Sequence, residues 1–233
     1  MQDQWYGDKR DLVKWGTLLE LARKYQVTQI LQVLYHRSNT WNPIEIDGQS
    51  VRIPDEVIQH FRDTKSICNL NSSVPVQVLG ETFSDRERYL RYVVGEIQGR
   101  KGIKKIVFLD PDTGLQPRGG HPNWKHVLEG ELETIWNSLS DKDVLVFYQH
   151  QPHIPDWINT KKRQFAEVIR IPDAKCAYAP LIAPDVVFFF AQRAIENESI
   201  RQYGPGFLVP SPLAPSPSFE ERFMAKKVVP ACP

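Results

Sequence analysis

Two short segments of this sequence constrain the fold more than any other feature. Lys104–Leu109 and Asp143–Tyr148 have uninterrupted apolar centres, which is typical of strands that are buried on both faces of a sheet. Thr28–Tyr35 is apolar and β-branched and predicts a third buried strand, while Val76–Leu79 predicts a shorter one. Each of these strands therefore needs covering elements above and below it.

Helical periodicity fills the segments between these strands. Apolar residues at intervals of three and four predict amphipathic helices. Such helices are expected over residues 10–25, 84–98, 123–139 and 156–169, with a short one over 54–63. Strands that alternate with helices in this way predict an α/β fold, namely a Rossmann-like, mostly parallel sheet with helices on both faces.

The end of the folded region predicts an antiparallel pair of strands. Lys175–Leu181 and Val186–Gln192 are both strand-like, and only the four residues 182–185 join them. A link of that length is too short for a crossover helix, so the two strands are expected to pair as a C-terminal hairpin. Asp47-Gly48 predicts a second, shorter hairpin earlier in the chain.

Two details concern where helices begin and what they bury. Ser84 and Glu87 have the spacing of a capping box, in which each side chain accepts a hydrogen bond from a free backbone N–H. This predicts that a helix starts at Ser84. In the helix expected over residues 123–139, Trp124 is placed on the buried face together with Trp136.

Composition narrows the classes of partner and the compartment. The chain has 29 Lys and Arg against 28 Asp and Glu, a formal net charge of +1. No dense cationic field is available to hold duplex nucleic acid by charge alone. Three scattered cysteines form no disulfide framework, which predicts a reducing, cytoplasmic location. No apolar run reaches the roughly 18 residues of a membrane span, so membrane insertion is not expected.

The chain is expected to form one folded domain followed by a tail. Residues 1–202 are predicted to be the domain, and within it residues 38–75 are weakly patterned and predict a lid or binding loop. Residues 203–233 are rich in proline, which excludes helix and central strand. Two roles stay open for this tail: an extended segment that wraps the domain, or a contact segment for a protein partner.

The predicted sheet also ranks the polar residues. Ligands of such sheets bind beyond the carboxyl ends of the strands, so residues that directly follow a strand are the candidates for binding or catalysis. These are His36 and Arg37 after the strand Thr28–Tyr35, Asp110, Asp112, Thr113 and Gly114 after Lys104–Leu109, and Tyr148, Gln149 and His150 at the end of the strand that begins at Asp143.

The segment Asp110-Pro111-Asp112 is the strongest of these candidates. Its two carboxylates could bind a divalent cation through oxygen ligands or accept hydrogen bonds from an amine, and the plain alternative is a tight turn. Gly114 permits a close backbone approach or a left-handed turn. His150 could be a metal ligand, a general base or a phosphate contact, or could simply bond a backbone carbonyl.

A second set of candidates lies near the start of the chain. Tyr6, Asp8, Asp11 and Lys14 are polar groups just before and within the first helix. Asp8 or Asp11 is expected to cap the helix. Lys14 lies in the first turns, where a cation is unfavourable against the helix dipole, so another role is expected for it.

Two basic clusters are weaker candidates. Arg86, Arg88 and Arg91 share one predicted helix, and Lys161–Arg163 lie on another. Solvated helix faces are the expected explanation of both clusters.

These motifs resemble those of divergent class I S-adenosylmethionine-dependent methyltransferases, of the ribosomal RNA adenine-N6 methyltransferase and three-Cys-motif partner type. Asp11-Leu-Val-Lys14 is similar to the Asp-x-x-Lys helix that opens those proteins, and Asp110-Pro-Asp-Thr113 stands in the place of their Asp-Pro-Pro-Tyr. The combination also resembles an uncharacterised bacterial family. The resemblance implies S-adenosylmethionine as cofactor and nucleic acid as partner. Two departures are a first strand without a following Gly-rich turn and the loss of the aromatic that stacks on a flipped base.

Three functions follow from these candidates. In a methyltransferase-like enzyme acting on nucleic acid or a nucleotide, Asp110 orients the substrate amine, Asp112 supports it, and His150 binds or assists proton transfer. In a metal-dependent nuclease or phosphohydrolase, the same three side chains are ligands of a divalent metal. The third hypothesis is a non-catalytic module that senses a nucleotide or binds a protein. Titration with S-adenosylmethionine, dependence on Mg²⁺ or Mn²⁺, and deletion of the tail discriminate between them.

Overall fold

A six-stranded sheet organises the part of the chain that the computed structural model describes, which comprises residues 9–37, 44–55, 57, 64–69 and 73–194. The first four strands in spatial order run parallel, and β10 is antiparallel to both of its neighbours. The prediction of a mostly parallel sheet with a closing antiparallel pair is therefore confirmed. In spatial order the strands are β4 (Val76–Leu79), β1 (Gln29–Val33), β5 (Lys105–Leu109), β8 (Val144–His150), β10 (Ala183–Gln192) and β9 (Lys175–Ala179).

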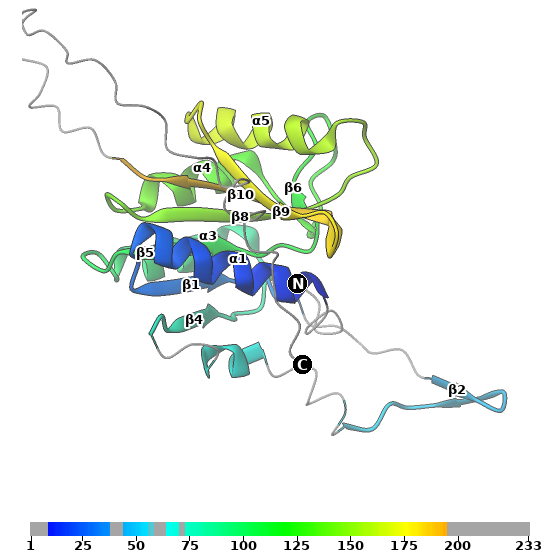
Figure 1. Cartoon of the computed structure of the whole chain (residues 1–233). Coiled ribbons are helices and arrows are strands. Elements are labelled where there is room, and N and C mark those ends of the chain that lie inside the picture. The colour runs from blue at the N-terminus through cyan, green and yellow to red at the C-terminus, as the bar shows by residue number, and fades with distance from the viewer. Residues whose placement is uncertain (1–8, 38–43, 56, 58–63, 70–72, 195–233) are drawn as a thin grey trace, which may run out of the picture. The chain divides into compact units, whose positions relative to one another are not determined.

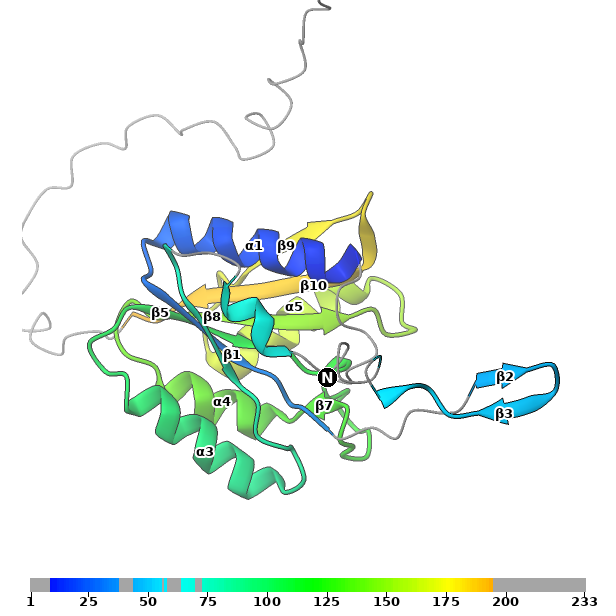
Figure 2. The ribbon, with the colours of Figure 1, turned by 90° about the horizontal axis from the view of Figure 1, so that it is seen from below.

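Helices cover both faces of this sheet. The first helix, α1 (Lys9–Tyr25), lies on one face, and α3 (Arg86–Gln98) and α4 (Glu129–Ser138) lie on the other (Figures 1 and 2). The apolar side chains of α5 (Trp157–Ile169) belong to the same core cluster as those of α3 and α4. The structure thus has three layers, with helices on both sides of the sheet as the sequence predicted.

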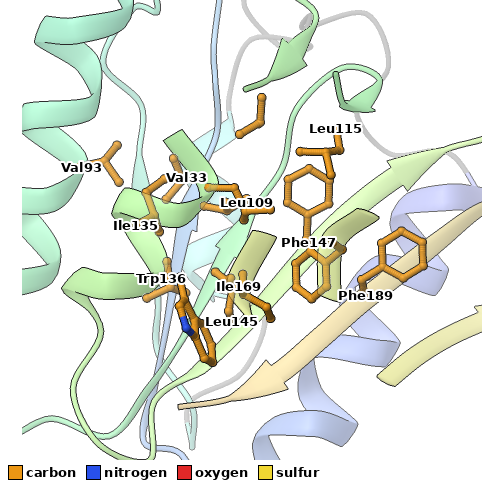
Figure 3. Packing of buried hydrophobic residues seen from close by; sticks show 14 of the residues in the cluster. Val33, Val93, Leu109, Leu115, Ile135, Trp136, Leu145, Phe147, Ile169 and Phe189 are labelled. Atoms are coloured by element: carbon orange, nitrogen blue, oxygen red, sulfur yellow. The ribbon is translucent and has the colours of Figure 1, made fainter. Parts of the chain in front are cut away.

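Two apolar cores explain why the central strands carry no polar face. Along β5, Val107 and Leu109 pack in the core under α3, α4 and α5, whereas Ile106 and Phe108 pack in the core under α1. All four side chains are fully buried. Figure 3 shows the larger core, where helix residues such as Trp136 pack over the strands. Burial on both faces is the physical reason for the uninterrupted apolar runs.

Short elements occupy the connections. The strands β2 (Ile44–Ile46) and β3 (Gln49–Val51) pair as an antiparallel hairpin. Asp47 and Gly48 form its turn with positive φ of 51° and 74°, as a two-residue turn of this kind requires. The hairpin predicted at this position is confirmed. A 3₁₀ helix, η2 (Thr64–Asn69), precedes β4, and most of the helix expected over residues 54–63 lies outside the described residues.

The helix predicted over residues 123–139 begins later than expected. The first residue of α4 is Glu129, because β7 (His126–Val127) pairs in parallel with β6 (Gly114–Leu115). Trp124 is therefore outside the helix and 45% exposed, which corrects its predicted burial. The capping prediction for α3 is wrong by one residue, since Asp85 Oδ1 accepts the Arg88 N–H at 2.7 Å.

A buried ion pair joins the amino ends of two central strands. Lys105 Nζ lies 2.8 Å from Asp143 Oδ2, and both side chains are fully buried. Asp143 also accepts hydrogen bonds from the backbone N–H groups of Lys105 and Ser140, at 3.1 and 2.9 Å. This carboxylate is therefore saturated with donors, as a buried charge requires.

The remaining predictions about the chain concern its ends and membranes. None of the described helices is long and apolar enough to cross a membrane. Tyr6, Asp8 and the proline-rich tail at residues 203–233 lie outside the described residues.

Candidate functional site

The strand order places the topological switch point of the sheet between the carboxyl ends of β1 and β5. From β1 the chain continues to β4 on one side, and from β5 it continues to β8 on the other. Connections that leave in opposite directions open a ligand crevice at that point of a parallel sheet. Arg37 follows β1 and Asp110 follows β5, so the residues ranked from sequence lie at this edge.

Asp110 is the centre of a buried polar network at this edge. Lys14 Nζ donates to Asp110 Oδ2 at 3.0 Å and to Asp11 Oδ1 at 2.7 Å. Gln32 Nε2 donates to the same Asp110 oxygen at 2.8 Å. Each of these four residues is at most 7% exposed. The network ties α1, β1 and β5 together, and it gives Lys14 a role beyond the helix face.

Burial and charge act in opposite directions on this network. Burial lowers the pKa of Lys14, but the carboxylates of Asp110 and Asp11 outweigh it and the pKa lies above its ordinary value. Burial raises the pKa of Asp110, and the ammonium of Lys14 offsets this only in part. Both directions follow from one lysine shared between two buried carboxylates. The site is therefore rich in acceptors.

Gln32 adds a further acceptor to the site. Its Oε1 is buried and has no hydrogen-bond partner among the described residues. The amide cannot be turned round, because that would place Oε1 against the Asp110 carboxylate. An unsatisfied buried acceptor costs about 1–3 kcal/mol. A ligand that donates a hydrogen bond at this point would remove the cost.

His150 belongs to a second, neighbouring cluster. Its Nε2 lies 3.1 Å from Asp185 Oδ2, and Arg10 donates to the same oxygen from Nε at 3.0 Å. Burial raises the pKa of Asp185, but the hydrogen bonds and charge of Arg10 bring it below its ordinary value. The His150 imidazole thus contacts Asp185, whereas its backbone N–H donates to the Thr113 carbonyl of the Asp110 loop at 2.8 Å.

The side chains of Asp112 and Tyr148 each contact other residues of the protein. Asp112 forms an ion pair with Arg37. Tyr148 is buried and packs edge-on against Phe188, with Lys14 Nζ 5.5 Å from its ring centroid.

Within the described residues, no group of three or more His, Cys, Asp and Glu side chains could hold a metal ion. The side chains of Asp110, Asp112 and His150 contact Lys14, Arg37 and Asp185 respectively, and their role as metal ligands stays a prediction.

Gln149 and Gly114 fix the loop that follows Asp110. Gln149 Oε1 accepts the Leu115 N–H at 2.9 Å, and Nε2 donates to the Thr113 carbonyl at 3.2 Å. Gly114 has φ of +128°, and a Cβ added there would lie 2.4 Å from Gln149 Oε1. The glycine thus allows a close approach by a side chain of the protein itself.

His36 contributes through its backbone. It is half-buried, and its carbonyl accepts the Phe83 N–H at 2.6 Å.

Lys161 is a residue whose role the sequence interpretation missed. It was expected on a solvated face, but it is 3% exposed and donates to the Leu115 carbonyl at 2.8 Å and to Gln164 Oε1 at 2.9 Å. Burial lowers its pKa to about 8, because Glu129 compensates for the lost hydration only in part. Lys161 lies four residues after buried Trp157 and four before buried Phe165. That spacing is the signal that places it on the inner face of α5.

The solvated face expected on α3 is present at Arg88 and Arg91, which are exposed, whereas Arg86 is half-buried. Arg86 forms two hydrogen bonds to Glu131, at 2.8 and 2.9 Å, and Arg91 pairs with Glu87 at 3.0 Å. Both cations are therefore compensated by neighbouring carboxylates. Gln32 and Asp185 were missed as well, and the signal for Gln32 is a polar residue with apolar neighbours on both sides in a buried strand.

No protein-family model matches this sequence, and no curated protein is significantly similar to it. Among solved structures, the chain resembles a crystal structure from Thermobifida fusca that is described as a "putative methyltransferase". The two share 12% identity with a TM-score of 0.40, over 80% of each chain. A likeness at this level carries no argument about the chemistry of this chain.

The Gly114–Gln149 contact predicts a specific loss of stability. Gly114→Ala should lower the free energy of unfolding by more than about 2 kcal/mol, because the new Cβ meets Gln149 and the φ value strains any L-residue. Urea denaturation measures this. Gly95→Ala is the control: it lies in α3 with open space around it and should stabilise by about 0.5–1 kcal/mol. A Gly114→Ala variant as stable as wild type would contradict the packing.

The buried ammonium of Lys161 predicts how stability changes with pH. Its pKa is about 8 in the folded chain against an ordinary 10.5, so its contribution is complete above pH 10.5 and is lost as pH falls through 8. Unfolding free energy should rise by roughly 1–2 kcal/mol from pH 8 to about 9.5. Lys161→Met should remove most of this rise. Denaturation at each pH measures the unfolding free energy of both proteins. An equal rise with pH in wild type and Lys161→Met would contradict the prediction.

Proposed function

We propose that this chain is a methyltransferase-like protein that binds S-adenosylmethionine at the carboxyl edge of its sheet and acts on an amino group of nucleic acid or a nucleotide. The observation that carries the proposal is the buried Asp110 network with its unpaired Gln32 Oε1. This arrangement presents acceptors to a ligand that brings N–H donors. Exocyclic amines of bases, and the amino groups of adenosine and methionine, are ligands of that kind.

The positions of the two motifs that resemble methyltransferase motifs support the proposal. The Asp-x-x-Lys segment and the strand-end Asp lie 96 residues apart in the sequence, yet Lys14 and Asp110 form a direct ion pair. A buried pair of this kind is weak evidence for stability alone. Its place at the switch point of the sheet, where ligands bind in this architecture, favours a role in the site.

The turn after β1 decides how such a ligand is held. Tyr35 has φ of 48° and is buried against Phe83 and Tyr89, with ring centroids 5.2 and 5.4 Å away. Side chains therefore fill space that a Gly-rich turn would leave to the ligand. Contacts to an adenosine-containing ligand would come from the polar residues of the site, chiefly Lys14, Gln32 and Asp110.

Each of these residues has a definite task in the proposed reaction. S-adenosylmethionine, when bound, supplies an electrophilic methyl group on a sulfonium. The Asp110 carboxylate accepts a hydrogen bond from the substrate amine and so orients the nitrogen lone pair. Lys14 and Gln32 hold the accepting carboxylate in place, and the buried position keeps water from it.

Isothermal titration with S-adenosylmethionine tests the proposal. Wild-type protein should bind, and Asp110→Asn should weaken binding by about tenfold or more, which corresponds to about 1.4 kcal/mol. Asp143→Asn changes a buried carboxylate at the opposite edge and is the matched control, with unchanged affinity once its folding is verified. A flat trace with wild-type protein at high micromolar concentration would exclude S-adenosylmethionine as a cofactor.

Binding without methyl transfer would favour a different hypothesis. If the titration succeeds but neither single-stranded oligonucleotides nor free nucleotides are methylated, the chain is a ligand-binding module rather than an enzyme. The metal-dependent hydrolase hypothesis gains no support from the described residues, since their carboxylates and His150 point to separate partners.

A further inference from the structure

The loop that follows Asp110 contains an exposed tryptophan. Trp124 is 45% exposed, and within the described part of the chain only Tyr178 is a more exposed aromatic residue. Phe83 packs edge-on against Trp124 with ring centroids 5.3 Å apart. The Arg86 guanidinium carbon lies 5.3 Å from the same ring centroid. Trp124 is thus supported from the protein side while much of it faces solvent.

Hydrogen bonds hold the segment around Trp124 in place. Arg86 donates to the backbone carbonyls of Asn123 and His126, and its other nitrogen is fixed by Glu131. Asn123 Oδ1 accepts the Lys125 N–H at 2.9 Å. An aromatic ring in a segment held by this many hydrogen bonds loses little conformational freedom when a ligand stacks on it.

The same segment lies beside the candidate site. The Thr113 N–H donates to the Lys125 carbonyl at 3.0 Å, and Gly114 pairs with His126. Phe83, which supports Trp124, is joined to the end of β1 through the His36 carbonyl. Trp124 is therefore connected to both strands whose carboxyl ends flank the switch point.

The cations around Trp124 include Lys125, which is next to it in the sequence. Residues 113–128 contain no Asp or Glu. Arg118 of this segment pairs with Glu129 and Glu167, and Arg86 pairs with Glu131. A lysine beside an exposed aromatic ring matches the combination of phosphate and base. A protein partner is less well matched, because Leu181, the most exposed of the large apolar side chains described, lies on the link between β9 and β10.

We propose that Trp124 is a stacking platform for a base of single-stranded nucleic acid, with Lys125 contacting its backbone phosphate. The inference deepens the proposed function, since it rests on that function for the chemistry at Asp110. Base stacking itself needs no cofactor. Trp124 would supply the stacking aromatic that is absent from Asp110-Pro-Asp-Thr113 itself.

Fluorescence anisotropy with a labelled single-stranded RNA of about twelve nucleotides, at low salt and without cofactor, tests this. Trp124→Ala should weaken binding at least about tenfold, and Trp124→Phe should stay within about threefold of wild type, because one stacked base contributes about 1–3 kcal/mol. Tyr178→Ala removes the other exposed aromatic ring of the described residues and should change nothing. Lys125→Gln should reduce the slope of log affinity against log salt by about 0.7.

Four outcomes would overturn the inference. The first three are no RNA binding by wild type, RNA binding by Trp124→Ala equal to wild type, and a loss of RNA affinity in Tyr178→Ala equal to that in Trp124→Ala. The fourth is a Trp124→Ala variant that loses affinity for S-adenosylmethionine in the titration but keeps its affinity for RNA. The retained affinity of Trp124→Phe shows that the loss comes from the ring rather than from misfolding. Because this assay contains no cofactor, its failure is separate from failure of the S-adenosylmethionine titration.

Discussion

Burial of both faces of the sheet forces every charge at its edges to find a partner inside the protein. The chain meets this constraint twice, with Lys105–Asp143 at the amino edge and Lys14–Asp110 at the carboxyl edge. The two pairs differ in how completely they are satisfied. Asp143 receives three donors from its own surroundings, whereas the Asp110 network leaves the buried Gln32 Oε1 without a partner among the described residues. We propose that this difference separates a structural ion pair from a site that accepts a ligand.

The loop after Asp110 owes its shape to residues from three other elements. Gln149 from β8 and Lys161 from α5 bind its backbone, and Arg86 from α3 binds the segment that carries Trp124. A loop fixed from so many sides can hold functional groups in one geometry, as binding and catalysis require. The acceptor network and the exposed ring thus become two parts of one edge, the first suited to an amine and the second to a base.

Sequence patterns were sufficient where burial alone determines structure. The apolar runs predicted β5 and β8, and the rule that ligands bind at carboxyl ends selected Asp110 as a strand-end residue, which the strand order then places at the switch point. The sequence patterns failed where tertiary contacts determine the local structure. The pairing of β6 with β7 delays α4 and exposes Trp124, while the carbonyl of Leu115 draws Lys161 inward. Asp112 follows β5 and His150 ends β8, yet their side chains pair with Arg37 and Asp185, which only the folded chain could reveal.

The central claim is that the switch point between β1 and β5 receives an adenosine-containing ligand at the Asp110 network. A crystal structure of the full chain soaked with S-adenosylmethionine tests it most directly. The expected result is ligand density at the carboxyl ends of these strands, with a donor nitrogen or hydroxyl within hydrogen-bond distance of Gln32 Oε1 or Asp110. Density elsewhere, or an undisturbed network at saturating ligand, would contradict the claim.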